Sequence, residues 1–200
     1  VFASCTAMTS FDNANTAISS SLLGTADAAE RTAVINWSRG SDLKDEDGDA
    51  NTSENRPFIH GDVVHSRPVA INYGTDAAPQ VVTYYGGNDG ALRAVNGNRS
   101  TAIGGVAAGS ELWSFVPPEF YPGLKRLYDN SVTISFPGHT AGVPTPLPKD
   151  YGFDGPVTAL KNASTTWLYA SMRRGGRALY AFDVTVPGSP TLKWKKGCPN

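Results

Sequence analysis

Alternation of apolar and polar residues is the main structural signal in this chain. The runs "VVTYY" at Val81–Tyr85 and "ALYAFDV" at Ala178–Val184 repeat every second residue, which is the period of a strand with two distinct faces. Glycine-rich stretches, "GGNDG" at Gly86–Gly90 and "RGG" at Arg174–Gly176, adjoin these runs and tolerate the positive φ of tight hairpins. The pattern therefore predicts short antiparallel strands joined by tight turns.

The chain contains two copies of one structural unit. "PV" at Pro68 recurs at Pro156, and "ALRAV", which begins at Ala91, recurs as "ALYAF". "ELWSFV" around Trp113 recurs as "LKWKK" around Trp194. These landmarks keep the same order, so we interpret them as a duplication. In the first copy, strands are expected at residues 68–72, 81–85, 91–96 and 112–116.

A four-stranded antiparallel unit that recurs in tandem and ends in a Trp-bearing strand is typical of a β-propeller blade. One blade cannot cover both of its faces, so neighbours must stack on it. We expect Trp113 and Trp194 to fill the gaps between adjacent blades, each burying roughly 150–250 Å². The sequence thus predicts a mainly β fold. It places a propeller region at residues 61–200, with two blades at about 62–116 and 154–196. Because a propeller usually needs at least about four blades, the chain is expected to be part of a larger one.

Residues 1–60 are expected to form a short helical segment and an acidic loop that lead into the propeller. Asp27 and Glu30 have the spacing of a capping box, and the apolar residues that follow fall on one helix face. An earlier short helix is expected at residues 15–23, with Gly24 ending it.

A proline-rich insertion at residues 117–150 interrupts the repeat. A short helix is expected from Pro118 to Asn130, and an irregular loop after it. Long insertions between blades often lie where partners bind, although a passive spacer is an equal alternative.

The composition narrows the classes of function. The chain is 40% hydrophobic with a net charge of -1, so it lacks the basic balance typical of a nucleic-acid-binding protein. No apolar run is long enough to span a bilayer. Cys5 and Cys198 could form a disulfide or remain free thiols.

One acidic stretch, "SDLKDEDGDANTSE" at Ser41–Glu54, is a candidate calcium site. Its alternating oxygen-bearing side chains could converge on one side of a tight loop, and Ca²⁺ takes about six to eight oxygen ligands. The pattern departs from an EF-hand loop because Gly48 follows the second aspartate, and a solvated acidic loop is the alternative. The predicted ligands are Asp45, Asp47, Asp49, Asn51 and Glu54.

No catalytic residues are predicted. His60, Asp62 and His65 lie close together in sequence, but we interpret them as satisfied polar residues at a strand entry rather than as metal ligands. The chain shows no nucleophile elbow and no phosphate loop, and no helix follows "GGNDG" to bind an anion.

Several motifs together resemble the C-terminal domain of the PilC/PilY family, the type IV pilus tip-associated adhesins of Gram-negative bacteria. They are "AVINWSRGSD", "HGDVVHSRPVAINYG", "VVTYYGGNDGALRAVNG", "ELWSFVPPEFYPGL", "YGFDGPV" and "RRGGRALYAFDVT". The resemblance as a whole extends from about Ala14 to Trp194. The resemblance implies a quinoprotein-like β-propeller that is exported to the pilus tip, outer membrane or cell surface. It implies roles in pilus biogenesis, retraction control and adhesion. Pilin or minor pilins and a host or abiotic surface would be the partners.

The resemblance also implies regulation by calcium. The acidic D-x-D-x-D-G loop of the family lies further along the propeller than Asn200, so the loop around Asp45–Asp49 is a candidate secondary site. The family domain is longer than this chain, so a fragment is expected.

Two alternative functions remain. "GGNDGALRAVNG" followed by "ELW" resembles the repeats of pyrroloquinoline-quinone (PQQ)-dependent dehydrogenases, which would need a cofactor cavity with a catalytic aspartate beside bound Ca²⁺. Many of those enzymes carry adjacent cysteines, which this sequence lacks. The other alternative is a β-propeller scaffold for outer-membrane assembly.

Overall fold

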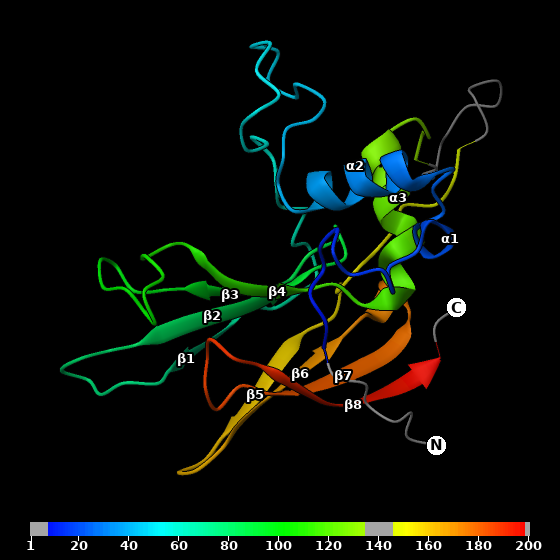
Figure 1. The fold of residues 1–200 in the computed structure, drawn as a ribbon. Coiled ribbons are helices and arrows are strands. Elements are labelled where there is room, and N and C mark those ends of the chain that lie inside the picture. The colour runs from blue at the N-terminus through cyan, green and yellow to red at the C-terminus, as the bar shows by residue number, and fades with distance from the viewer. Residues whose placement is uncertain (1–7, 135–145, 199–200) are drawn as a thin grey trace. The chain divides into compact units, whose positions relative to one another are not determined.

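The computed structural model describes residues 8–134 and 146–198 (Figure 1). Cys5 lies outside the described residues, so the choice between a Cys5–Cys198 disulfide and two free thiols stays open. The chain divides into two compact units. The sheet unit comprises Asp62–Val116 and Tyr151–Asn200 with Val1–Met8, and the helical unit comprises Thr9–Gly61 and Pro117–Asp150.

The sheet unit contains two four-stranded antiparallel sheets, ordered β1-β2-β3-β4 and β5-β6-β7-β8 (Figure 1). The prediction of a mainly β chain with two such sheets is therefore confirmed. Within the described residues the two sheets do not close into a ring. The strands are β1 Val69–Asn72, β2 Val81–Gly86, β3 Leu92–Asn96, β4 Glu111–Phe115, β5 Val157–Lys161, β6 Thr166–Ser171, β7 Arg177–Asp183 and β8 Thr191–Cys198.

Strand register shows that the two sheets repeat residue by residue. In each sheet a tyrosine of the second strand pairs with an alanine of the third, and that alanine pairs with a tryptophan of the fourth. In each sheet the register also shifts directly after the alanine, at a β-bulge or similar irregularity. We call these cross-strand sets the Tyr-Ala-Trp rows, and they are Tyr84–Ala94–Trp113 and Tyr169–Ala181–Trp194.

The register corrects one detail of the sequence alignment. Val69 lies opposite Tyr84, whereas the residue opposite Tyr169 is Thr158 and not Val157. The two "PV" motifs are therefore one residue out of structural register. Because neighbouring residues of a strand point to opposite faces, the two aligned valines lie on opposite faces of their sheets.

A hydrophobic core lies between the two sheets. Trp113 packs into it with ring centroids 5.8 Å from Tyr84 and 6.3 Å from Phe182 of the other sheet. Its indole Nε1 donates a hydrogen bond to the carbonyl of Pro187 at 2.7 Å. The prediction that a tryptophan fills the gap between adjacent sheets is thus confirmed for Trp113.

Trp194 does not lie in that core. It packs against Tyr169 on the face of the second sheet that points away from the first, with ring centroids 6.0 Å apart. The prediction that Trp194 fills a gap between blades stays a prediction, because the described residues hold no sheet on that side of the second sheet. The Tyr-Ala-Trp row lies on the same face of each repeated sheet, and in the first sheet that face is turned toward the second.

The segment "YGFDG" at residues 151–155, which we call the glycine-bearing segment, runs between the β2–β3 turn and the β6–β7 turn. The Phe153 amide donates to the Gly87 carbonyl at 3.2 Å. A Cβ on Gly152 would lie 2.5 Å from the Gly87 carbonyl oxygen and 2.5 Å from the Cα of Gly90. Only glycine at position 152 lets these backbones approach so closely, which explains the first glycine of "YGFDG".

The described residues of the helical unit form three helices and a short 3-10 turn at Pro118–Phe120. The predicted capping box is confirmed, since the Asp27 carboxylate accepts from the Glu30 amide at 2.8 Å and Glu30 accepts from the Ala26 amide at 2.6 Å. The first helix begins later than expected and ends before Gly24, whose φ is 70°. The helices are α1 Ser20–Leu23, α2 Ala28–Ser38 and α3 Tyr121–Asp129.

Side chains from distant parts of the sequence hold these helices together. The ring of Trp37 on α2 meets the ring of Tyr128 on α3 edge-on, with centroids 5.8 Å apart. Lys125 on α3 pairs with Glu30 on α2 at 2.8 Å. None of the helices in the described part of the chain is long and apolar enough to cross a membrane.

Candidate functional site

The acidic stretch forms a loop that is closed at its neck. Ser41 and Asn55 form an antiparallel bridge, and the Asp42 amide donates to the Glu54 carbonyl at 2.9 Å. The Arg56 amide donates to the Gly40 carbonyl at 2.7 Å. These backbone bonds bring the two ends of the loop together, so side chains about a dozen positions apart in sequence become neighbours.

The base of the loop is fixed to helix α2. Glu46 accepts hydrogen bonds from the indole Nε1 of Trp37 at 2.8 Å and from Arg56 Nε at 2.9 Å. The Arg56 guanidinium stacks over the Trp37 ring at 3.5 Å from its centroid. Glu46 therefore serves as an anchor, and its carboxylate is already neutralised by Arg56.

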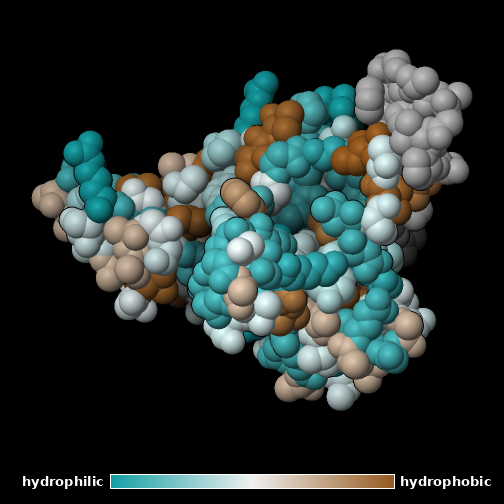
Figure 2. Space-filling model, turned by 90° about the horizontal axis from the view of Figure 1, so that it is seen from above, coloured by the Kyte–Doolittle hydropathy of each residue, from teal (hydrophilic) through white to brown (hydrophobic). Residues whose placement is uncertain are grey.

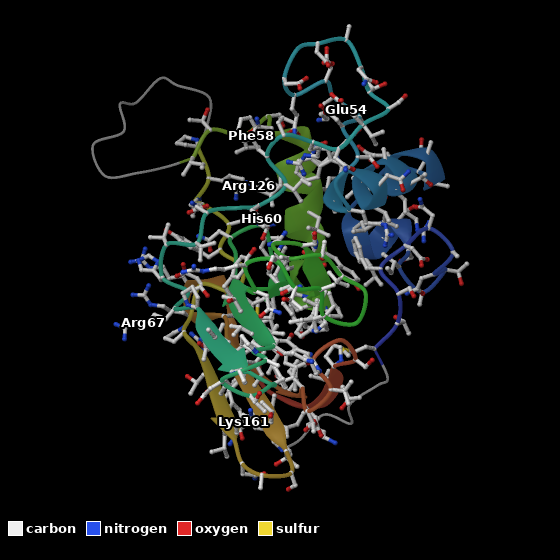
Figure 3. All side chains as sticks on the ribbon, turned by 90° about the vertical axis from the view of Figure 1, so that its left-hand side faces the viewer. Glu54, Phe58, His60, Arg67, Arg126 and Lys161 are labelled. Atoms are coloured by element: carbon white, nitrogen blue, oxygen red, sulfur yellow. The ribbon has the colours of Figure 1, made fainter. Side chains whose placement is uncertain are left out.

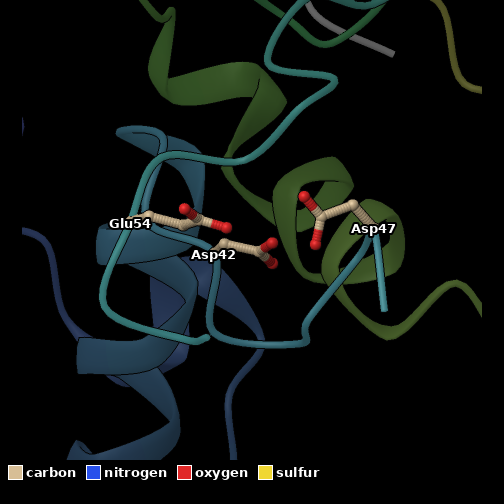
Figure 4. A group of neighbouring side chains, drawn as sticks. All are labelled: Asp42, Asp47 and Glu54. Atoms are coloured by element: carbon tan, nitrogen blue, oxygen red, sulfur yellow. The ribbon is translucent and has the colours of Figure 1, made fainter. Parts of the chain in front are cut away.

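Carboxylates gather in two groups that share Asp47. The first holds Asp42, Asp47 and Glu54, and the second holds Asp45, Asp47 and Asp49, each with oxygens within 4.8 Å of one another. Figure 4 shows the carboxylates of Asp42 and Glu54 turned toward that of Asp47. Hard carboxylate oxygens at this spacing are the donor type that Ca²⁺ prefers.

Backbone conformation and side-chain caps shape the tip of the loop. Asp45 and Ala50 have positive φ values of 51° and 67°, and the Asp45 carboxylate accepts from the Ala50 amide at 3.0 Å. Asp49 accepts from the Asn51 amide at 2.8 Å. These local bonds turn the backbone so that alternating aspartates point to one side.

The acidic neighbours in the loop act on the carboxyl of Glu54. Burial and then the charges of Asp49, Asp47 and Asp42 raise the pKa of Glu54 above its ordinary value. The lysine of the loop, Lys44, lies 3.9 Å over the ring of Tyr128 and donates to its backbone carbonyl, so it is directed toward α3.

The structure brings most of the predicted ligands together. Asp45, Asp47 and Asp49 converge, and Glu54 joins Asp47. Asn51 instead has its oxygen bound to the Ser53 amide at 3.1 Å and its nitrogen bound to Glu54 at 3.2 Å.

Sequence reasoning missed Asp42, which is 0% exposed and accepts from the Glu46 amide at 3.0 Å and 3.1 Å. The signal available in the sequence was an aspartate at the start of the acidic run. That position alone does not reveal that the neck brings Asp42 beside Glu54.

A second polar cluster lies in the sheet unit. Asp154, 1% exposed, bonds His65 Nδ1 at 2.8 Å and pairs with Arg173 at 3.4 Å. It joins the segment before β1 to the segment before β5 and to the turn after β6. His65 is therefore held by a carboxylate, as expected of a satisfied polar residue at a strand entry.

The exposed apolar side chains do not gather in one large patch on the face seen in Figure 2. Figure 2 shows hydrophobic side chains on one face as small separate patches among polar ones. Arg67 points away from the sheets, and Phe58 is 71% exposed (Figure 3). Phe58 is followed by further exposed apolar residues of the same segment, namely Ile59, Val63 and Val64.

Comparison with known proteins gives a consistent set of relatives, although no family model matches the chain. It is 29% identical over 221 residues to the type IV pilus biogenesis factor PilY1 homolog of Xylella fastidiosa, covering 98% of this chain and 16% of that protein. It is 30% identical over 166 residues to PilY1 of Pseudomonas aeruginosa strain UCBPP-PA14, covering 70% of this chain and 12% of that protein. The chain therefore spans only a small part of the length of these relatives.

Among solved structures, the Pseudomonas aeruginosa PilY1 C-terminal domain is similar at 26% sequence identity. The match covers 59% of this chain and 18% of that chain, with a TM-score of 0.32.

Proposed function

Because the chain belongs to the PilC/PilY family, we propose that it serves type IV pilus biogenesis as a non-enzymatic, exported part of a pilus-associated protein. The observation that carries this proposal is similarity over 98% of the chain to a protein named as a type IV pilus biogenesis factor. The closed acidic loop and the paired sheets are the parts through which it would act.

The proposed location is the bacterial surface, at the pilus tip or outer membrane. Pilin or minor pilins are the proposed partners in assembly, and a host or abiotic surface is the proposed target of adhesion. The names of the relatives support the pilus association. Adhesion and control of retraction are extensions of that association.

The two sheets are proposed to be consecutive blades of a β-propeller. The repeated Tyr-Ala-Trp rows, each followed by a register shift, support this interpretation. So does the burial of the first row against the second sheet, since blades cover one another in this way.

A role as a scaffold or adhesin is favoured over PQQ-dependent catalysis. A PQQ-dependent enzyme would need a catalytic aspartate beside bound Ca²⁺. In the described residues the buried carboxylate of Asp154 is instead held by His65 and Arg173. The discriminating measurement is the absorbance of the protein after incubation with pyrroloquinoline quinone and Ca²⁺. A bound-cofactor spectrum with reduction by an alcohol would replace the proposal with the enzymatic one.

The acidic loop is proposed to bind Ca²⁺ through Asp42, Asp45, Asp47, Asp49 and Glu54. Their carboxylates repel one another, and a divalent cation would replace that repulsion with attraction. When bound, the ion would supply a fixed charge that ties the loop tip to its neck. We propose that this stiffening regulates pilus extension and retraction.

The function is tested by deleting the gene for the natural polypeptide and counting surface pili by electron microscopy. Loss of pili, restored by the wild-type gene, is the expected result. Normal piliation and twitching in the deletion strain would contradict a role in biogenesis. Calcium binding by the loop is tested separately by calorimetry, where heat of Ca²⁺ binding at submillimolar metal is expected.

A further inference from the structure

Basic charge is concentrated in the second half of the sheet unit. Between residues 151 and 198 the chain has seven lysines and arginines against two aspartates. Asp154 is already held by His65 and Arg173. Asp183 is already paired with Lys193 at 3.4 Å. The net charge of -1 for the whole chain therefore conceals a strongly basic region.

Four exposed arginines of the sheet unit lie at one end of it, which we call the turn end. The turn end comprises the β2–β3 and β6–β7 turns and the segments before β1 and β5. The Phe153 amide, before β5, donates to the Gly87 carbonyl in the β2–β3 turn at 3.2 Å. The first amide of β5 donates to the Arg67 carbonyl, before β1, at 3.3 Å. The arginine cluster consists of Arg67, Arg173, Arg174 and Arg177.

Two guanidinium groups of the arginine cluster are held in position, and two are unpaired. Arg173 lies 3.4 Å from the buried carboxylate of Asp154, while its side chain remains 46% exposed. Arg174 Nη1 donates to the Tyr151 hydroxyl at 3.2 Å. Within the described part of the chain, the other two guanidinium groups have no hydrogen-bond or ion-pair partner. Figure 3 shows Arg67, one of these two, pointing away from the sheets.

Exposed apolar side chains lie beside the arginine cluster. Asp62 is fixed to the β2–β3 turn, because its backbone carbonyl and its carboxylate each accept from Asn88 at 3.1 Å. His65 is fixed to the segment before β5 by its bond to a buried carboxylate. The two residues between these anchors, Val63 and Val64, are 39% and 62% exposed. The turn end therefore presents aliphatic side chains within a few residues of unpaired cationic groups.

We propose that the turn end of the sheet unit is a peripheral membrane-binding surface, which attaches to the anionic phosphate headgroups of a lipid leaflet. Guanidinium groups bind phosphate oxygens in a bidentate manner, and clustered basic residues are attracted to negatively charged lipid. The exposed valines enter the headgroup region, as apolar side chains do at membrane interfaces. This inference rests on the proposed location at the bacterial surface and specifies how the polypeptide is held at the outer membrane.

A soluble polyanion, such as a nucleic acid or an acidic polysaccharide, fits the turn end less well. Its charges would pair with the arginine cluster, but it has no hydrocarbon to cover Val63 and Val64. The headgroup region of a lipid leaflet offers both phosphate and hydrocarbon. The combination of unpaired arginines with exposed valines is what favours a membrane.

The test is flotation of the natural full-length polypeptide with lipid vesicles. We expect binding to vesicles of equal parts phosphatidylcholine and phosphatidylglycerol to be at least about tenfold stronger than binding to pure phosphatidylcholine. Raising the salt to about 0.5 M should release most of the protein, because exposed charges are then screened. Equal binding to the two kinds of vesicle would overturn the proposal.

Charge variants locate the surface. Arg67→Gln should weaken binding to the mixed vesicles by about fivefold, and its combination with Arg174→Gln and Arg177→Gln by about thirtyfold or more. Arg99→Gln is the matched control, because it removes an exposed charge from the β3–β4 connection at the opposite end of the sheet unit. Equal losses from Arg67→Gln and Arg99→Gln would overturn the proposal, since binding would then follow net charge and not this surface.

An apolar variant separates a membrane from a soluble polyanion. Val64→Ser should weaken vesicle binding by about threefold or more and leave retention on a heparin column unchanged. Val186→Ser, at a position 61% exposed in the β7–β8 connection, is the control. Retention on heparin without flotation would assign the arginines to a soluble polyanion and overturn the proposal. Pilus counts of the deletion strain do not depend on these assays, so failure of the membrane surface is distinguishable from failure of the proposed pilus function.

Discussion

Asp47 is the residue on which the acidic loop depends, because its carboxylate belongs to both groups of converging oxygens. The lysine in the loop is directed to Tyr128 and the arginine at its neck is paired with Glu46, so neither neutralises Asp47. An uncompensated carboxylate at the centre of others is suited to a cation.

Replacing Asp47 with asparagine should weaken Ca²⁺ binding by about tenfold or more, corresponding to about 1.4 kcal/mol. The physical reason is the loss of a charge common to both carboxylate groups. Isothermal titration calorimetry measures the affinity, and Asp76→Asn, an exposed aspartate in the β1–β2 connection, is the control. Equal affinity in the two variants would place any bound ion elsewhere.

Glu54 gives the loop a pH dependence. Its pKa is raised in the folded chain, so the folded state holds the proton more tightly than the unfolded state does. Its contribution to stability is therefore present at low pH and is lost as pH rises through the folded pKa. Without divalent cations, Glu54→Gln should raise the free energy of unfolding at pH 7 and change it little at pH 3.

Urea unfolding at the two pH values measures this difference, with Asp76→Asn as the reference substitution. Saturating Ca²⁺ should reverse the sign at pH 7, because the ion then needs the carboxylate. A gain in stability that is equal at both pH values would show that the charge of Glu54 is not its source.

At the scale of elements, the period-two pattern was sufficient to predict the strands, and the capping-box spacing predicted helix α2. The period-two pattern was not sufficient to predict the register between neighbouring strands. The "PV" motifs align in sequence, yet cross-strand pairing puts Val69 and Val157 on opposite faces of the repeated sheet, because an offset of one residue turns a strand over.

Helix α2 should depend on its N-cap. Asp27→Ala removes the acceptor for the Glu30 amide and should cost about 1 kcal/mol of stability in the helical unit. Asp27→Asn keeps an acceptor and should cost much less. Amide hydrogen exchange over Ala28–Ser38 is the measurement, and equal exchange in the two variants would argue against the cap.

Position 152, where Gly152 passes close to Gly87 and Gly90, should tolerate no side chain. Gly152→Ala places a Cβ 2.5 Å from backbone atoms of Gly87 and Gly90, so it should destabilise the sheet unit by about 1–3 kcal/mol. Gly188→Ala is the matched control, because a Cβ there meets nothing within 4 Å. Thermal unfolding followed by circular dichroism compares the variants, and similar midpoints would contradict the close approach.

At the scale of the whole molecule, the helical unit joins segments that lie far apart in sequence. The sequence of either segment, Thr9–Gly61 or Pro117–Asp150, does not predict that the two pack together. A helix pattern shows which face is apolar but not which distant helix covers that face. The converging aspartates were predictable because they are local, whereas the pairing of Asp42 with Glu54 required the closed neck.

Leu124, 2% exposed on α3, should connect the two segments energetically. Leu124→Ala should cost about 2–5 kcal/mol and raise amide exchange in α2 as well as in α3. Leu22→Ala, at an exposed leucine of α1, is the control. Faster exchange confined to α3 would mean that α2 is stable without its partner helix.

The contact between Trp37 and Tyr128 also sets an order of events during synthesis. A ribosome adds about 5–20 residues per second, so α2 must wait roughly 5–20 s before α3 has been made. During that interval the indole has no partner ring and the nascent chain presents an apolar stripe to its surroundings. A chaperone that holds emerging chains would bind there, at a helix that is translated before the helix that covers it.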